Sequence, residues 1–233
     1  MEEPQNIYLD NNATTQVAPE VLKAMTPCLE RFWGNPSSMH TFGGRVKKCI
    51  DFAREQVAAL IHAHPEEIIF TSCGSESNNM ALRGTVDARG GHTHIITSNV
   101  EHPAIRSLCH YLKSLGCGLT ELPVDTQGLL DPEQLKEALT PQTGIVSLMW
   151  ANNETGVLFP IEKMAALVKS SGALFHTDAV QAAGKVPIDV RDVPVDMLSI
   201  SGHKLHAPKG IGVLYLRKGV KINPFIIGGH QEY

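Results

Sequence analysis

The chain has 233 residues, of which 42% are hydrophobic and 19% charged, proportions typical of a globular domain and unlike those of a disordered protein. A formal net charge of −4 excludes the strongly basic surface used by nucleic-acid binders, and no apolar run reaches the roughly 18 residues of a membrane span. The first residues, MEEPQNIYLDNN, are acidic and polar, unlike a secretory signal or a transit peptide. We therefore expect a cytoplasmic protein with no nucleic-acid or membrane partner.

Five cysteines and eleven histidines raise the question of disulfides or a metal. Five is an odd number, and no cysteine pair has the C-x-x-C spacing of zinc and redox motifs, so we expect reduced, mostly buried thiols. The pairs His92/His94 and His203/His206 have no third ligand at a suitable spacing. No metal site is expected.

The first 60 residues differ in pattern from the rest of the chain. Helical patterns cover 19–32 and 44–60, and the irregular stretch Trp-Gly-Asn-Pro-Ser-Ser at 33–38 joins them. We expect residues 1–60 to be a helical segment that packs on a larger domain, residues 61–233, without joining its sheet.

From residue 61 onward, short apolar runs alternate with helical patterns. Strands are predicted over 67–71, 94–97, 118–123, 144–150, 173–177, 196–200 and 212–216, and helices over 75–89, 103–115, from Asp131 onward, and over 161–170. This alternation indicates βαβ units, and hence a three-layer α/β/α domain with a mostly parallel, seven-stranded sheet. The loop between the last two strands is too short for a helical crossover. These strands are therefore either hairpin-like neighbours or linked across other strands, and a mixed sheet is expected.

Polar residues follow five of the predicted strands. They are Ser72 to Ser75, Glu101 and His102, Asn152 to Glu154, Asp178 and Gln181, and Ser201, His203 and Lys204. Ligands of open α/β sheets bind at the carboxyl ends of the strands. The sequence therefore predicts one polar rim at that edge of the sheet.

Four of these groups also have a purely structural explanation. The Ser/Gly-rich turn at 71–75 is either an anion site at a helix start or an ordinary turn capped by a serine. Asp178 either faces a cation or a protonated ring nitrogen, or caps the segment after it. Lys204, beside the apolar Leu205, is either a Schiff-base amine with a lowered pKa or a surface lysine. His102 is either a stacking ring or a structural histidine.

In combination, the four groups predict a single cofactor. A phosphate cradle, an acid for a pyridinium nitrogen, a flat imidazole and a Schiff-base lysine are what pyridoxal 5'-phosphate requires. Asp178 would keep the ring nitrogen charged, which makes the ring a better acceptor of carbanion electrons. The loop that carries Lys204 would then hold both the reactive amine and part of the phosphate site.

Eight motifs occur in a characteristic order along the chain. They are YLDNNATT at 8–15, GNPSS at 34–38, FTSxxSESN at 70–78, TSxxEH at 97–102, NNExG at 152–156, HxDxxQ at 176–181, SGHK at 201–204 and GGHQE at 228–232. With them the chain resembles the cysteine desulfurases of the NifS/IscS type, within the class-V aminotransferase group of fold-type I pyridoxal-phosphate enzymes. Each motif alone is modest, but their order and distances are specific.

The resemblance implies roles for the matching residues. Lys204 would be the Schiff-base lysine and His102 would stack on the ring and shuttle protons, which makes both catalytic. Asp178 would pair with the ring nitrogen, Gln181 would hydrogen-bond the phenolic oxygen, and Asn153 would lie near that oxygen and the substrate carboxylate. The phosphate would be held by Gly74, Ser75, Ser201 and His203. Cys73 stands where relatives often have glycine, and we interpret it as structural.

The resemblance also implies a reaction and partners. A desulfurase is a transferase that converts L-cysteine to alanine and an enzyme persulfide, for sulfur transfer in pathways such as iron–sulfur cluster biogenesis. In relatives, the nucleophilic cysteine and an arginine lie in a smaller C-terminal domain. None of the five cysteines of this chain corresponds to that nucleophile. We therefore expect a truncated chain that alone binds the cofactor weakly, if at all, and does not turn over. The expected partners are a second copy or a complementing C-terminal polypeptide, and a sulfur acceptor or scaffold protein.

Two alternatives share these residues. A selenocysteine lyase would cleave a C–Se bond with the same cofactor site. A non-catalytic scaffold would retain the pocket as a relic, although a relic has no physical need of Lys204, Asp178, His102 and Gln181.

Overall fold

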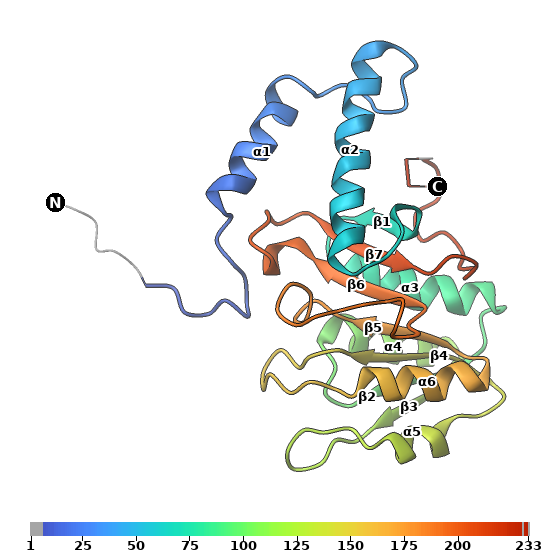
Figure 1. The fold of residues 1–233 in the computed structure, drawn as a ribbon. Coiled ribbons are helices and arrows are strands. Elements are labelled where there is room, and N and C mark those ends of the chain that lie inside the picture. Colours follow the sequence, from blue (N-terminus) through green and yellow to red (C-terminus); the bar gives the residue numbers. More distant parts are fainter. Residues whose placement is uncertain (1–6, 230, 233) are drawn as a thin grey trace.

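The computed structural model describes residues 7–229, 231 and 232, and these form one seven-stranded sheet with helices on both faces (Figure 1). The strands are β1 (Ile68–Thr71), β2 (His94–Ser98), β3 (Gly118–Leu122), β4 (Thr143–Met149), β5 (Leu174–Asp178), β6 (Met197–Ser201) and β7 (Gly212–Leu216). Their spatial order is β1-β7-β6-β5-β4-β2-β3. The prediction of a mixed, mostly parallel sheet is confirmed, because only β7 runs antiparallel to its neighbours.

Six α-helices accompany the sheet in the described residues: α1 (Pro19–Glu30), α2 (Thr41–Leu60), α3 (Gly74–Ala88), α4 (Pro103–Ser114), α5 (Pro132–Ala138) and α6 (Ile161–Ser171). Two single turns of 3-10 helix, η1 (Pro65–Glu67) and η2 (Gly202–Lys204), precede β1 and follow β6. Helices α3 and α4 cover one face of the sheet, and α5 and α6 cover the other (Figure 1). This gives the predicted three layers.

The core is divided by the sheet into two clusters, one on each face. The cluster under α3 and α4 includes Leu82 and Ile105, and the cluster under α5 and α6 includes Leu135 and Met164. All four side chains are fully buried. Every residue of β4 is buried, as expected for a central parallel strand covered on both faces.

Helix starts and stops follow the expected local chemistry. Asp131 caps α5 by accepting a hydrogen bond from the amide of Glu133 at 2.9 Å, as the sequence predicts. Helix α6 ends at Gly172, whose φ of 79° lies in the left-handed region that glycine tolerates. Helix α2 begins before the predicted residue 44, because His40 caps it through the amide of Gly43.

The last two strands form a hairpin-like antiparallel pair, with Ser201 opposite Gly212. The alternative of a link across other strands is wrong, since β6 and β7 are direct neighbours. The turn η2 lies between them and carries Lys204. The lysine is thereby held at the carboxyl end of β6.

Helices α1 and α2 form an arm that rises from the β1 edge of the sheet (Figure 1). No residue of α1 is buried, whereas Ala58, near the end of α2, belongs to the core under α5 and α6. Trp33 packs edge-on against Phe42 between the two helices, with ring centroids 5.1 Å apart. The described residues before Ile61 contain no strand of the sheet.

Among the described residues, no helix has the length and apolar character needed to cross a lipid bilayer. The acidic stretch 1–6 and His230 of the predicted motif at 228–232 lie outside the described residues.

Candidate functional site

A cavity of about 500 Å³ opens at the carboxyl ends of the parallel strands. The nine residues that the sequence proposes for cofactor binding all line it: Gly74, Ser75, His102, Asn153, Asp178, Gln181, Ser201, His203 and Lys204. They lie at or just after the carboxyl ends of five strands, which the sheet brings to one edge. Their roles stay a prediction, but their convergence follows from the sheet topology.

Asp178 is the last residue of β5 and lies in the cavity wall, 7% exposed. Its Oδ1 accepts a hydrogen bond from the amide of Val180 at 3.0 Å, so it does cap the following turn. Its Oδ2 accepts one from the side-chain nitrogen of Asn78 at 2.8 Å. Burial raises the pKa of Asp178, while these two hydrogen bonds and the nearby His102 and Lys204 oppose that shift.

Asn78 is a site residue that the sequence reasoning missed. It lies on α3, is 1% exposed and lines the cavity. Its Oδ1 is buried and has no hydrogen-bond partner within the described part of the chain. A signal was available in the sequence, because Asn78 follows Gly74 by four residues, and this spacing places both on one face of a helix.

Lys204 lines the same cavity and interacts electrostatically with Asp178. Its ammonium donates hydrogen bonds to the carbonyls of Asn12 and Ala13, the second at 3.0 Å. Burial lowers its pKa, and repulsion from Lys185 lowers it further. The expected direction of the shift is therefore present. The amine itself contacts backbone carbonyls, which the apolar neighbour Leu205 does not reveal.

The N-terminal segment closes one side of the cavity, which the predicted elements do not foresee. Asp10, Asn12 and Ala13 line it. The amide of Thr15 donates to the carbonyl of His203 at 2.9 Å, and the side chain of Gln181 donates to the carbonyl of Asn12 at 3.0 Å. The motif at 8–15 is therefore a wall of the site.

His203 is tied to this wall. Its Nδ1 lies 3.1 Å from the hydroxyl of Thr14. Burial lowers the pKa of His203, as do the positive charges of Lys204 and Lys209. With Nδ1 engaged, Nε2 is the ring atom suited to reach an anion in the cavity.

His102 has the structural role considered for it in the sequence, and its stacking role stays a prediction. It is the N-cap of α4, where Nδ1 accepts a hydrogen bond from the amide of Ala104 at 3.1 Å. It also lines the cavity. An accepting Nδ1 assigns the proton of the neutral imidazole to Nε2.

The start of α3 packs directly against the loop after β5 and the end of β6. A Cβ atom on Gly74 would lie 2.9 Å from Cγ2 of Val180 and 3.3 Å from Cβ of Ser201, so glycine permits this approach. The N-cap residue is Cys73, and no side chain caps the helix. The alternative of an ordinary turn capped by a serine is therefore wrong. An anion site at the start of α3 stays the prediction for this turn.

These residues fit pyridoxal 5'-phosphate. The cavity has the size of a cofactor site, which typically spans about 300–1,000 Å³. It offers a buried carboxylate, an amine with a lowered pKa, and a helix start beside Ser201. The unpartnered Oδ1 of Asn78 is a further buried polar atom in its wall.

The cysteines and the candidate metal ligands were also considered as functional groups in the sequence. All five cysteines are free thiols, but only Cys109 and Cys117 are buried, so the expectation of mostly buried thiols is wrong. Within residues 7–229, 231 and 232, no three His, Cys, Asp or Glu side chains cluster as metal ligands would.

Comparisons with known proteins agree with this geometry. A model of the family "Aminotransferase class-V" matches residues 7–232. "Cysteine desulfurase 2" of Trichormus variabilis is 58% identical over 226 residues, and "Cysteine desulfurase NifS" of Azotobacter vinelandii is 53% identical over 228. Each alignment covers 97% of this chain and 57% of the relative, so the chain spans little more than half the length of these relatives.

Solved structures of similar proteins have the same fold. "SspA in complex with cysteine" and a "NIFS-LIKE PROTEIN" both superpose with a TM-score of 0.95 at 40% identity. The alignments cover 97% and 98% of this chain, and 66% and 63% of those chains. With a family match over nearly its whole length and the corresponding fold, the chain belongs to the class-V aminotransferase family.

Proposed function

We propose that this protein binds pyridoxal 5'-phosphate and acts in a cysteine desulfurase, which takes sulfur from L-cysteine to leave alanine and a persulfide. The observation that carries the proposal is that Lys204 and Asp178 line one cavity beside the start of α3. It is supported by relatives named cysteine desulfurases at 50–58% identity and by a similar protein solved in complex with cysteine.

Lys204 would hold the cofactor covalently through its amine, and Asp178 would accept a hydrogen bond from the ring nitrogen. Pyridoxal phosphate, when bound, supplies an electron sink for the substrate's α-carbon. The lowered pKa of Lys204 favours the neutral, nucleophilic amine. Asn78 holds the carboxylate of Asp178 in place through Oδ2.

The remaining predicted residues would orient the cofactor and move protons. His102 would face the ring and exchange a proton at Nε2, because Nδ1 is engaged with Ala104. Gln181 and Asn153 would bind the phenolic oxygen and the substrate carboxylate. The phosphate would lie at the start of α3 and receive hydrogen bonds from Gly74, Ser75, Ser201 and His203.

We further propose that the 233-residue chain carries the cofactor site without the sulfur nucleophile. Within the described part of the chain, Cys73 is the one cysteine that lines the cavity. It occupies the N-cap position of α3, where the phosphate would lie, and its sulfur lies 3.7 Å from the hydroxyl of Ser72. A thiol fixed in this position would face the phosphate and not the sulfur of a substrate held near Lys204. Cys73→Ala is therefore expected to retain cofactor binding.

Spectroscopy and a turnover assay test these proposals. With pyridoxal phosphate added in excess, the purified chain should give the visible absorbance band of a lysine-bound cofactor, which Lys204→Ala should abolish. Lys209→Ala is a matched control, because Lys209 lies exposed in the same loop and outside the cavity. Sulfide and alanine should not form from L-cysteine with this chain alone. A band that survives in Lys204→Ala would overturn the role of Lys204 in holding the cofactor. Robust turnover would overturn the proposal that this chain lacks the sulfur nucleophile.

The two alternatives receive less support. The names of the relatives favour C–S over C–Se cleavage, which rates with cysteine and selenocysteine on a complete enzyme would separate. A scaffold without cofactor would give no absorbance band when pyridoxal phosphate is added.

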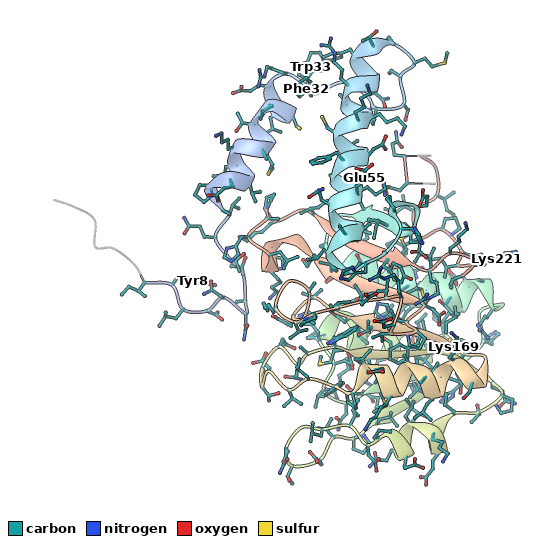
Figure 2. The ribbon with its side chains drawn as sticks, viewed as in Figure 1. Tyr8, Phe32, Trp33, Glu55, Lys169 and Lys221 are labelled. Carbon is teal, nitrogen blue, oxygen red and sulfur yellow. The ribbon has the colours of Figure 1, made fainter. Side chains whose placement is uncertain are left out.

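We propose that the protein is a homodimer in which the arm formed by α1 and α2 contributes to the interface. The proposal is supported by exposed apolar side chains on this arm, including Leu29, Trp33 and Phe52, which are 72%, 71% and 62% exposed. Figure 2 shows Phe32 and Trp33 at the outer end of the arm, away from the sheet. Light scattering should give twice the chain mass, and Trp33→Lys with Phe52→Lys should give a monomer. An unchanged mass would contradict this assignment.

Two further aspects follow from the same proposal. The persulfide sulfur would pass to an acceptor or scaffold protein, as in iron–sulfur cluster biogenesis. The cytoplasm would be the compartment, which is supported by five free thiols.

A further inference from the structure

His102 and Asn153 stand on two separate loops. His102 ends the turn between β2 and α4, and Asn153 belongs to the loop between β4 and α6. Both line the cavity. A cofactor held between such loops requires a fixed spacing, because errors of about 1 Å in positioning weaken binding and catalysis.

Glu101 joins these two loops through one oxygen atom. Its side chain is 5% exposed. Oε1 accepts a hydrogen bond from the hydroxyl of Ser98 at 2.7 Å, and a second from the amide of Met149 at 3.0 Å. Ser98 ends β2, and Met149 ends β4 and lines the cavity. One carboxyl group therefore bridges the ends of two neighbouring strands, directly before His102.

Asn152 makes the reciprocal connection and is 8% exposed. Its Nδ2 donates to the carbonyl of Val100 at 3.3 Å, on the turn that carries His102. Its Oδ1 accepts hydrogen bonds from the amides of Glu154 and Thr155, at 2.9 and 3.0 Å. The same side chain thus shapes its own loop and holds the neighbouring turn.

We propose that Glu101 and Asn152 are positioning residues that form a two-way brace, which sets the spacing of His102 and Asn153 across the cavity. The functional significance of the brace rests on the proposed function, in which His102 and Asn153 contact the cofactor and the substrate. The brace itself is a property of the chain without any ligand.

The chemistry of Glu101 predicts which part of its side chain matters. Burial raises its pKa to about 8, and the negative charge of Asp178 acts in the same direction. Its Oε2 is buried and has no hydrogen-bond partner among the described residues, so a charge there would be uncompensated. The brace therefore needs the accepting Oε1 and no charge. A glutamine supplies the same acceptor, whereas leucine fills a similar volume and supplies none.

The decisive comparison is between Glu101→Gln and Glu101→Leu in the full 233-residue chain. The readouts are the NMR signals of the His102 ring without cofactor, and the dissociation constant and visible circular dichroism with pyridoxal phosphate. Glu101→Gln should resemble the wild type in all three. Glu101→Leu should shift the His102 signals, alter the dichroism and weaken binding about five- to tenfold, the effect of one or two lost hydrogen bonds. Glu121→Leu is the control, since Glu121 pairs with Arg106 at the protein surface.

Asn152→Asp provides a second test that does not depend on the stability of the leucine variant. Aspartate keeps the acceptor for Glu154 and Thr155, but it loses the donor to the carbonyl of Val100 and to the sulfur of Met149, and it brings a carboxylate. It should shift the signals of His102 in the same sense as Glu101→Leu. The brace is refuted if neither variant moves the His102 signals, or if Glu101→Gln is as damaging as Glu101→Leu. Because these signals are measured without cofactor, this outcome is distinct from a failure of the chain to bind pyridoxal phosphate.

Discussion

The side-chain nitrogen of Asn78 lies 2.8 Å from Oδ2 of Asp178 and donates a hydrogen bond to it. The two residues come from α3 and β5, and both are almost fully buried. A buried carboxylate without a donor would tend to take up a proton, because burial raises its pKa. The amide of Asn78 therefore helps to keep Asp178 ionised and oriented.

Asn78→Ala should weaken the binding of pyridoxal phosphate about tenfold, because loss of this hydrogen bond raises the pKa of Asp178 and loosens its side chain. The dissociation constant, measured by fluorescence titration, tests this. Asn79→Ala is the matched control, since Asn79 donates to the carbonyl of Ser75 and does not contact Asp178. Equal affinities of the wild type and Asn78→Ala would contradict the expectation.

Glu101→Gln should change how stability depends on pH. The folded protein holds a proton on Glu101 up to a pKa of about 8, whereas the unfolded chain releases it near the ordinary value of 4.5. Between these values the folded state binds more protons, so the wild type loses stability relative to Glu101→Gln as pH rises, by at most about 1.4 kcal/mol per unit.

Urea unfolding of both proteins at several values between pH 5 and 8 measures this difference. A difference in unfolding free energy that stays constant with pH would show that Glu101 is already ionised in the folded protein.

Lys204→Ala should loosen the N-terminal wall of the cavity in the absence of any cofactor. The ammonium of Lys204 holds the carbonyls of Asn12 and Ala13. Without it, amide hydrogens over 12–15 should exchange with solvent about tenfold faster, because local opening costs less free energy. Hydrogen exchange with mass spectrometry measures the rates, with Lys209→Ala as the control. Unchanged protection of this segment would rule out the tether.

His176→Ala should destabilise the fold by about 2–4 kcal/mol. The ring of His176 is fully buried in β5 and bridges the hydroxyls of Ser147 and Ser199, at 2.8 and 2.9 Å. Its removal leaves a cavity and two buried hydroxyls without their partner. Denaturant unfolding gives the loss, and His110→Ala, an exposed position, should cost less than about 0.5 kcal/mol. Similar losses for both variants would argue against the bridge.

The sheet was predictable because its physical signals are local. Buried strands such as β4 are short and mainly apolar in sequence, and the alternation with helices implies parallel pairing. Polar residues that follow such strands must meet at one edge, which is why Asp178 and Lys204 could be placed together before the structure was known.

Other parts of the site depend on contacts between distant segments, which a sequence pattern does not reveal. The closure of the cavity by Asn12 and Ala13 joins the N-terminal segment to η2, far along the chain. The raised pKa of Glu101 arises from burial between β2 and β4. The motif at 97–102 contains Glu101 but does not reveal this burial. Asn78 could have been inferred from helix periodicity, since it lies one turn after Gly74.

The position of β7 has a consequence for synthesis on the ribosome. Among the strands of the described residues, β1 is synthesised first, but the one strand that pairs with it is β7, which is synthesised last of the seven. Until then, the backbone of Ile68 and Ile69 lacks the strand with which it pairs. The growing chain therefore carries an unpaired strand edge from the synthesis of β1 until that of β7, and a chaperone that shields β1 in this interval should raise the yield of native protein more than one that acts after release.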